Sequence, residues 1–336
     1  MSKENILMEK IVSLCKRRGF IFPGSEIYGG LANSWDYGPL GVELKNNIKQ
    51  LWWKRFVQQR DDMVGIDAAL IMNPKVWEAS GHLKEFSDPL VECKKCKRRF
   101  RADHVEGKKC PDCGGELGEA RQFNLMLKTF LGPAEDNASV AYFRPETAQA
   151  MFVDFKNVLE TSRKKVPFGI AQIGKAFRNE ITPGNFIFRT REFEQMEIEY
   201  FINPKDDWNK HFEYWKDQMV AWLKDIGVTK NYELVEIPEN ERAHYSKRTI
   251  DIEYKYPFGQ KELYGLAYRT DFDFKNHEKF SGQNLKYRDP ETGEEFWPHV
   301  IEPTFGLDRS ILVTLLEAYT EEQMANSKDN TSGAHS

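Results

Sequence analysis

The chain has few of the features that mark secreted or membrane proteins. Its 336 residues include only five cysteines, and no apolar run approaches the length of a membrane span. The N-terminus, Met-Ser-Lys-Glu-Asn-Ile, lacks the apolar stretch of a signal peptide. The formal net charge of −4 neither demands nor excludes a nucleic-acid partner. With 40% hydrophobic residues the chain can bury a large core, so we expect a cytoplasmic globular enzyme without membrane contact.

Two common nucleotide-binding signatures are also missing. The sequence contains neither a P-loop lysine motif nor a G-x-G-x-x-G turn, so the folds that carry them are not indicated. Instead, two extended runs at 168–178 and 188–201, joined by a turn at 182–185, predict a β-hairpin. Its arginines, aromatic rings and carboxylates suit the phosphates, base and exocyclic amine of a nucleotide. A charged hairpin exposed to solvent would have the same composition, so a second element is needed to decide.

That second element lies near the C-terminus. Residues 301–309, Ile-Glu-Pro-Thr-Phe-Gly-Leu-Asp-Arg, read as a strand and a tight glycine turn that lead into an apolar helix. Arg309 falls in the first turn of this helix, where unpaired N–H groups already favour an anion. A cation here opposes the helix dipole, which disfavours the alternative that Arg309 merely lies on a surface helix.

Together these two elements resemble the second and third signature motifs of class II aminoacyl-tRNA synthetases. In detail the chain is similar to the dimeric glycyl-tRNA synthetases over about residues 5–320. The main motifs are Phe-Arg-Asn-Glu at 177–180, Phe-Arg-Thr-Arg-Glu-Phe at 188–193, Arg-Pro-Glu-Thr-Ala-Gln at 144–149, Tyr-Gly at 264–265, Arg-Thr-Asp-Phe-Asp at 269–273 and Gly-Leu-Asp-Arg at 306–309. Further matching segments begin at Phe22, at Trp35 and at Met72, the last with Ser80-Gly-His82.

The resemblance implies an α+β fold, in which an antiparallel sheet is flanked by helices and a zinc ribbon is inserted at 88–118. The catalytic domain would comprise residues 1–87 and 119–320, and the polar tail at 321–336 is expected to be disordered. Periodicity predicts helices at 5–18, 42–59, 147–160, 205–226 and 305–319, and strands, besides the hairpin, at 65–72, 231–237, 249–256, 261–269 and 294–302. The family would continue after residue 320 into an anticodon-binding domain, which this sequence does not contain.

The helix at 42–59, the strand after it and Pro74 correspond to the first signature motif. In the family this motif builds the dimer interface, so a homodimer is expected. Apolar residues such as Leu44, Ile48 and Leu51 follow helical spacing. An amphipathic helix packed on its own core would show the same pattern, so the sequence alone leaves both interpretations open.

The resemblance also implies a reaction. Glycine would be activated by ATP with release of pyrophosphate and then transferred to the 3′ end of tRNA, with positioning and countercharge in place of a covalent nucleophile. Arg178 and Arg309 would be the catalytic residues, Arg309 and Phe193 would enclose the adenine, and Glu180 would accept from its amine. The implied ATP site comprises Arg178, Asn179, Glu180, Phe188, Arg189, Phe193, Glu262, Leu263, Gly306 and Arg309.

Glycine has no side chain, so its recognition must come from its ammonium group and from excluded volume. Glu146 and Glu197 would anchor the ammonium, with Thr304 as a further polar wall. The implied glycine site comprises Arg101, Glu146, Glu197, Glu302 and Thr304. Glu262 and Glu302 would hold Mg²⁺ through oxygen ligands.

The chain departs from the family pattern at three positions: Thr304 stands for serine, Ala150 for glycine and Tyr268 for a small polar residue. Thr304 keeps the hydroxyl and adds a methyl group, which either tightens the site or displaces the substrate. Two other functions remain open: a paralogue that passes glycine or an analogue to a non-tRNA acceptor, and a non-catalytic nucleic-acid-binding relative. A pure binding module would not need Glu146 and Arg178, which argues against the latter.

Four of the five cysteines form paired knuckles, Cys93-Lys-Lys-Cys96 and Cys110-Pro-Asp-Cys113. This spacing predicts one structural Zn²⁺ held by four thiolates. Two disulfides or a redox-active pair are the alternatives, and a reducing cytosol and the tandem arrangement disfavour them. Cys15 lies outside the quartet and is predicted to be a buried apolar residue.

Basic residues crowd the same segment. They are Lys94, Lys95, Lys97, Arg98, Arg99, Arg101, Lys108 and Lys109. Such a cluster either binds the backbone of a tRNA acceptor stem or forms an ordinary solvated surface, and the sequence favours neither.

Overall fold

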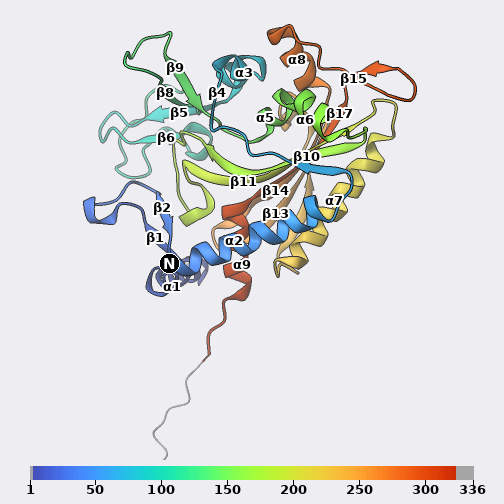
Figure 1. Cartoon of the computed structure of the whole chain (residues 1–336). Coiled ribbons are helices and arrows are strands. Elements are labelled where there is room, and N and C mark those ends of the chain that lie inside the picture. Colours follow the sequence, from blue (N-terminus) through green and yellow to red (C-terminus); the bar gives the residue numbers. More distant parts are fainter. Residues whose placement is uncertain (1–2, 323–336) are drawn as a thin grey trace, which may run out of the picture.

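The computed structural model describes residues 3–322, and its centre is a twisted seven-stranded sheet (Figure 1). In spatial order the strands are β12 (Tyr232–Glu236), β13 (Arg248–Tyr256), β14 (Gly259–Thr270), β17 (His299–Gly306), β11 (Glu192–Ile202), β10 (Phe168–Phe177) and β3 (Met63–Gly65). Neighbouring strands are antiparallel, except that β3 runs parallel to β10. The predicted antiparallel sheet and its β10–β11 hairpin are therefore confirmed.

One layer of helices covers one face of the sheet (Figure 1). It consists of α1 (Lys3–Arg18), α2 (Pro39–Trp53), which continues into a π-helical turn at Lys54–Gln58, α7 (Trp208–Asp225) and α9 (Leu307–Ala318). Trp52, Phe56 and Trp222 are fully buried around Phe305 of β17. Burying such rings stabilises the fold by roughly 1.5–3 kcal/mol each, so the aromatic face of α7 is core, as predicted.

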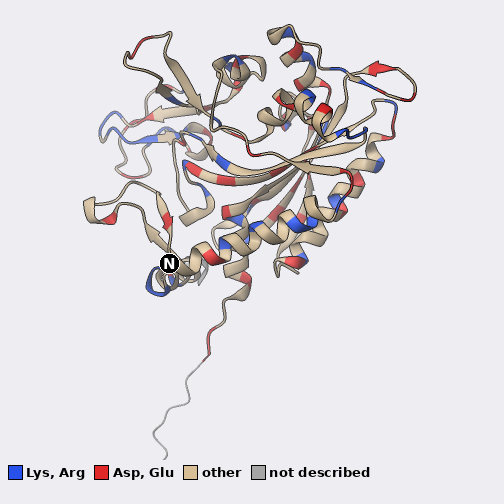
Figure 2. Ribbon diagram, viewed as in Figure 1, with Lys and Arg blue, Asp and Glu red and all other residues tan. Residues whose placement is uncertain are grey.

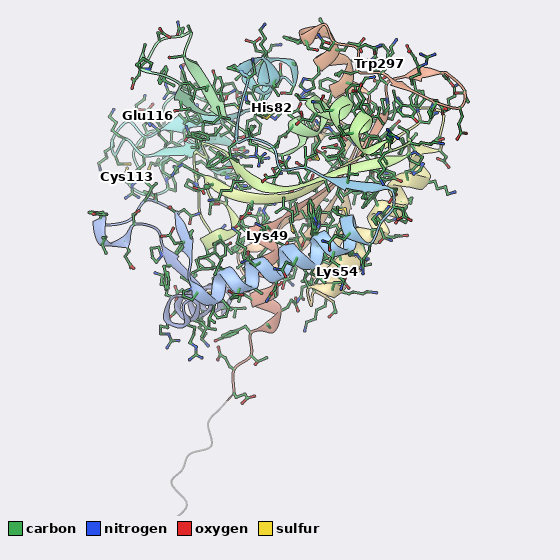
Figure 3. All side chains as sticks on the ribbon, in the orientation of Figure 1. Lys49, Lys54, His82, Cys113, Glu116 and Trp297 are labelled. Atoms are coloured by element: carbon green, nitrogen blue, oxygen red, sulfur yellow. The ribbon has the colours of Figure 1, made fainter. Side chains whose placement is uncertain are left out.

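The opposite face carries shorter helices. They are α5 (Ala148–Val153), α6 (Phe155–Ser162) and α8 (Phe272–Ser281). The rings of Phe152, Phe155 and Phe274 pack there against Phe201 of β11. Figure 3 places His82 on this side of the sheet, opposite α2 with Lys49. The single helix predicted at 147–160 is wrong in detail, because the chain breaks at Asp154 into two helices, and α8 was not predicted at all.

Two predicted strands differ from the structure. The strand predicted at 65–72 is replaced by two short strands, β3 at its start and β4 (Ile71–Met72) at its end. Between them the backbone of Ala68 is bound by side chains: Arg144 Nη1 donates to Ala68 O, and the Ala68 N–H donates to Gln172 Oε1. The strand predicted at 294–302 instead forms β16 (Glu295–Phe296), which pairs with β15 (Tyr287–Arg288), and β17.

Smaller elements surround one end of the sheet. They are β1 (Ile21–Pro23), β2 (Trp35–Tyr37), β4 (Ile71–Met72), α3 (Pro74–Ala79), α4 (His82–Glu85), β5 (Ser87–Glu92), β6 (Arg99–Arg101), β7 (Arg121–Asn124), β8 (Leu127–Phe130) and β9 (Val140–Phe143). Strands β6, β5 and β7 form the sheet of the inserted segment, which thus extends a few residues beyond the predicted 88–118. The predicted disordered tail lies, from residue 323 onward, outside the described residues.

The basic cluster of the insertion is partly neutralised. Figure 2 shows its lysines and arginines beside acidic residues. Lys94 Nζ lies 2.7 Å from Glu116 Oε1, and Arg98 Nη1 lies 2.7 Å from Asp112 Oδ2. These ion pairs weaken the positive potential that the basic cluster alone would produce. Within the described residues, no helix is both long and apolar enough to span a membrane.

Candidate active site

The site lies on the α5–α8 face of β11 and β17. Side chains alternate along β11, so Gln195, Glu197 and Glu199 lie on the face opposite the large aromatic core. Antiparallel pairing places Glu197 directly beside Thr304 of β17. One register thus brings together residues more than a hundred positions apart in the sequence.

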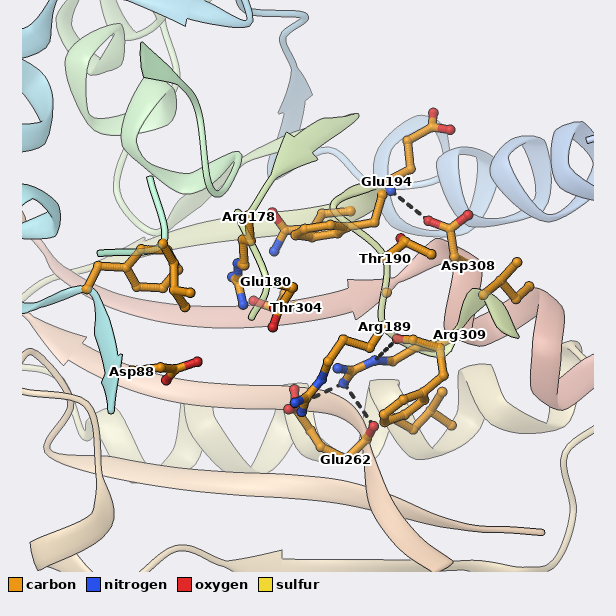
Figure 4. A pocket seen from close by; sticks show the side chains of 18 of the residues that line it. Asp88, Arg178, Glu180, Arg189, Thr190, Glu194, Glu262, Thr304, Asp308 and Arg309 are labelled. Atoms are coloured by element: carbon orange, nitrogen blue, oxygen red, sulfur yellow. Dashed lines mark hydrogen bonds and ion pairs between the residues drawn. The ribbon is translucent and has the colours of Figure 1, made fainter. Parts of the chain in front are cut away.

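A first cavity of about 310 Å³ opens above the ends of these strands (Figure 4). Four arginines, Arg101, Arg178, Arg189 and Arg309, line it. The Arg178 guanidinium lies between two rings, 5.3 Å from the centroids of both Phe86 and Phe193. Flat cationic and aromatic groups of this kind suit a polyphosphate attached to a base.

Arg309 is held at the edge of this cavity. It is the third residue of α9, as predicted, and its Cζ lies 4.5 Å from the centroid of Phe188. Its Nη1 donates to Glu262 O at 2.9 Å and lies 3.3 Å from Glu262 Oε2. A third contact, from its Nε to Phe188 O at 3.4 Å, completes the set that fixes the side chain and leaves the N–H groups of Nη2 for an anion.

Glu180 supplies an acceptor to the same cavity. Its Oε2 atom is buried and has no hydrogen-bond partner among the described residues. A buried acceptor without a donor is costly, so the site fits a ligand that donates a hydrogen bond, as an exocyclic amine does. Asn179, in contrast, does not line the cavity. Its backbone N–H donates to Leu125 O.

A second cavity, of about 400 Å³, adjoins the first. Arg178, Gln195, Glu262 and Thr304 line both. The lining of the second cavity also includes Glu146, Glu197, Glu241, Asp251 and Glu302, against Arg242 as a further cation. Carboxylates therefore outnumber basic groups, and this cavity suits a small cation.

Glu197 is a deeply buried carboxylate of the second cavity. It is 2% exposed, and both of its oxygens accept hydrogen bonds, one from Thr304 Oγ1 at 2.9 Å and one from Thr147 Oγ1. Burial and the neighbouring Glu146 raise the pKa of Glu197. No basic side chain of the described residues lies within ion-pair distance of it, so a bound cation would supply the missing countercharge.

Glu302 forms a buried ion pair with Arg269. Arg269 is 1% exposed and donates to Glu302 Oε1 at 2.6 Å and to both oxygens of Asp273 at 2.8 and 2.9 Å. The Tyr245 ring covers the guanidinium, with its centroid 3.8 Å from Cζ. Burial raises the pKa of Glu302, which also faces the Glu197 carboxylate.

Glu262 and Glu302 do not come together. Glu302 pairs with Ala267, five residues along β14 from Glu262, a separation on the order of 15 Å. One Mg²⁺ ion cannot bridge them. A shift in the register of β13 and β14 turns Glu262 toward Asp251: Cβ on Gly265 would stand 3.8 Å from Asp251 Oδ1 and 4.0 Å from Glu262 Oε1. Both carboxylates therefore lie beside Gly265, and two neighbouring carboxylates fit a divalent cation.

Arg101 also lies away from its predicted partners. It lines the first cavity and not the second, and its Nη1 donates to Asp88 Oδ2 at 2.6 Å. A second pair of contacts joins it to Asp103. Because both carboxylates hold the guanidinium, we reassign Arg101 from the glycine site to the mouth of the arginine-lined cavity.

The four knuckle cysteines converge as predicted. Their sulfur atoms all lie within 4.8 Å of one another, with Cys93 and Cys113 Sγ 3.5 Å apart and Cys96 and Cys110 Sγ 3.7 Å apart. A tetrahedron with Zn–S bonds of about 2.3 Å has edges of about 3.8 Å, so the quartet fits zinc. Cβ on Gly115 would stand only 3.1 Å from Cys93 Sγ and 3.3 Å from Cys113 Sγ, which explains the glycine turn.

One of these four thiols, that of Cys93, favours the thiolate form. The Cys96 amide donates to Cys93 Sγ at 3.5 Å, and such backbone contacts lower the pKa of Cys93 to about 6. Thiolates are the metal-binding form. Cys15, at 1% exposed, is buried in the aromatic core, as predicted.

Comparison with known proteins decides the family. A model described as the tRNA synthetase class II core domain (G, H, P, S and T) matches residues 130–319. Glycine--tRNA ligases of Alkaliphilus oremlandii, Treponema denticola and Thermobifida fusca are 56%, 54% and 52% identical to the chain. The matches cover 94%, 97% and 98% of the chain and 74%, 74% and 76% of these relatives. The chain belongs to the glycine--tRNA ligase family of class II aminoacyl-tRNA synthetases.

Solved structures agree on the class II fold. Prolyl-tRNA synthetase from Cryptosporidium parvum complexed with halofuginone and AMPPNP has a TM-score of 0.66 and 16% identity. The same enzyme complexed with L-proline and AMP has a TM-score of 0.61 and 13% identity. The chain spans about half the length of these structures, 54% and 52%, and the likeness shows the fold alone.

Two of the three departures from the family pattern lie outside both cavities. Tyr268 stacks on Trp208 of α7, 4.4 Å between centroids, on the far face of the sheet. Ala150 is buried within α5. Only Thr304 lines the cavities, and its hydroxyl donates to Glu197. The departure that bears on substrate binding is therefore the one that retains the hydrogen bond.

Several residues of the site were missed from the sequence. Thr147 and Arg269 lie within the quoted motifs and Gln195 lies within the predicted hairpin, but no role was predicted for any of them. Threonine and glutamine carry no distinctive sequence signal, and the partners of Arg269 are set by strand pairing. Arg144 is a further missed residue, and its position depends on Gly174. A Cβ atom on residue 174 would stand 2.1 Å from Arg144 Nη2, so only glycine leaves room for this buried guanidinium. Arg144 in turn organises the floor of the site by donating to Gln172 and to the backbone.

Proposed function

We propose that this chain activates glycine with ATP, forming glycyl-adenylate and pyrophosphate, and transfers the glycyl group to the 3′ end of tRNA(Gly). One observation carries the proposal. An arginine-lined cavity that suits ATP adjoins a carboxylate-lined cavity that suits a small ammonium, and Arg178 lines both. Family membership, with glycine--tRNA ligases at 52–56% identity, supports the same reaction.

In the first step the glycine carboxylate attacks the α-phosphate in line and expels pyrophosphate. Arg178 at the junction neutralises charge that develops at the phosphorus; its Nε donates to Pro145 O at 3.1 Å, which fixes its position. Arg189 and Arg309 bind the polyphosphate. Phe193 stacks on the adenine and Glu180 accepts from its amine.

Glycine is selected by its ammonium and by its size. Glu146 and Glu197 receive the ammonium, and Thr304 keeps Glu197 oriented. Glu302 closes the same wall, held by Arg269. Exclusion of a larger amino acid by clash requires the cavity to be filled around the bound substrate, because in an open pocket a methyl group changes binding by only ~1–3 kcal/mol.

Two metals belong to the proposal. Mg²⁺, when bound, screens the charge of the triphosphate, and Glu262 with Asp251 would hold it in preference to the Glu262–Glu302 pair. Zn²⁺ is structural and would be held by Cys93, Cys96, Cys110 and Cys113, within an inserted ribbon that comprises residues 88–118 and the rest of strands β5 and β7.

We further propose a cytoplasmic homodimer that meets the acceptor stem of its tRNA. On α2, Leu40 and Leu51 are 47% and 39% exposed and lie three helical turns apart on one face. Exposed apolar rows of this kind mark protein interfaces. Sedimentation velocity checks the dimer: the molar mass of the sedimenting species should be twice the chain mass of 39.2 kDa.

The reaction is tested by ATP–pyrophosphate exchange with each amino acid, followed by charging of total tRNA. Exchange should require glycine. Arg178→Ala should abolish it, because the charge at the junction is lost, whereas Arg288→Ala, an exposed arginine on β15, should leave it unchanged. Exchange that persists in Arg178→Ala would remove Arg178 from the reaction. Exchange driven by another amino acid would overturn the substrate.

A further inference from the structure

The segment from α3 to α4 contains the Ser80-Gly-His82 motif, which has no part in the function proposed above. His82 opens α4 and is 8% exposed. Its ring is packed edge-on between Trp77 and Phe86, with centroids 5.6 and 5.3 Å away. The Asn124 side chain donates to His82 O at 2.9 Å. The imidazole is therefore held from several sides in one orientation.

Both ring nitrogens have polar partners. Nδ1 lies 2.7 Å from Ser80 Oγ, and Nε2 lies 3.3 Å from Glu146 Oε2. An ionised carboxylate can only accept, so the nitrogen that faces Glu146 carries a proton. Ser80 is 3% exposed and fixes the other side of the ring. The imidazole thus presents an N–H to a carboxylate that lines the ammonium cavity.

Glu146 needs such a donor. Its other oxygen accepts from Gln149 Nε2 at 3.0 Å. The charged groups that act on it from the surrounding elements are His82 on α4, Arg269 on β14, Glu197 on β11 and Glu302 on β17. Asp273 on α8 shares the Gln149 Nε2 donor with it. Burial among other carboxylates favours the neutral acid, but His82 and then Arg269 hold the pKa of Glu146 well below its usual value.

We infer that His82 is a positioning residue for glycine: its Nε2–H holds the Glu146 carboxylate ionised and aimed at the substrate ammonium. This role rests on the proposed function, because it concerns the same ammonium. His82 itself lines neither cavity, so it acts through Glu146 and not by touching glycine. Phe86 packs on the His82 ring and also lies against Arg178 in the first cavity, so a test of this role must keep that packing.

Two substitutions separate this role from simple packing. His82→Phe keeps a ring between Trp77 and Phe86 but removes the donor, whereas His82→Gln removes the ring but keeps an N–H donor at the side-chain end. In pyrophosphate exchange, His82→Phe should raise the KM for glycine roughly 10- to 100-fold with the KM for ATP unchanged. His82→Gln should stay within about fivefold of the native chain. His211→Phe on α7, far from Glu146, is the matched control and should behave as the native chain.

The pH dependence gives an independent measurement. Without the donor, the pKa of Glu146 rises, so in His82→Phe the KM for glycine should increase as the pH falls and recover as the pH rises; the native chain should show a flatter profile. Thermal unfolding reports whether each variant folds. A His82→Phe variant with native glycine KM, or one in which ATP and glycine KM rise together, would overturn the role. If the native chain shows no glycine-dependent exchange, the proposed function fails instead.

Discussion

Glu197→Gln is the most direct test of the ammonium site. The substitution keeps the size of the side chain, and the amide oxygen still accepts from one of the two threonine hydroxyls that hold Glu197. What disappears is the charge. Glu197 has no basic partner among the described residues within ion-pair distance, so its charge is available for the substrate.

The magnitude follows from the contact that is lost. A hydrogen bond to a charged group contributes about 1.5–3 kcal/mol, and each 1.4 kcal/mol is a factor of ten. The KM for glycine should therefore rise roughly 10- to 150-fold. The KM for ATP should change less than about threefold, because Glu197 lines only the second cavity.

The assay is ATP–pyrophosphate exchange with glycine and ATP varied separately. Glu199→Gln is the matched control, because Glu199 is two residues along the same strand, fully buried, and lines neither cavity. Its KM values should match those of the native chain. Equal increases for glycine and ATP in Glu197→Gln, or an equal effect of Glu199→Gln, would refute the reasoning.

Three further outcomes are expected. Metal analysis should find one zinc per chain, lost in Cys96→Ser with a lower melting temperature but kept in Cys15→Ala; zinc-free native protein would disprove the ribbon. Burial and Glu302 raise the pKa of Glu199, so its proton is bound more tightly in the folded state and stability falls as the pH rises above 4.5. Glu199→Gln should therefore melt higher than the native chain at pH 8, with the difference shrinking toward pH 4.5; a constant difference would contradict this. Thr304→Val should raise the KM for glycine roughly fivefold by removing the hydroxyl that holds Glu197, while Thr304→Ser should not.

Local patterns in the sequence were sufficient for the main helices, most strands and the zinc quartet. Helical spacing in α7, alternation in β11 and the two C-x-x-C knuckles each depend on residues close together in the chain. These features can therefore be recognised from short stretches of sequence. The same holds for Arg309, whose place in the first turn of α9 follows from the glycine before it. The motif resemblance correctly indicated the family and the class II core.

Tertiary structure alone decided how these pieces meet. Strand register put Glu197 beside Thr304 but separated Glu262 from Glu302 by five residues, and no local pattern specifies register between distant strands. The break at 66–70 came from Arg144, a side chain far along the sequence that takes the place of a neighbouring strand. The contact of His82 with Glu146 likewise joins two segments that only packing brings together. Sequence spacing could identify which groups carry charge and metal, whereas long-range pairing determined which of them share a cavity.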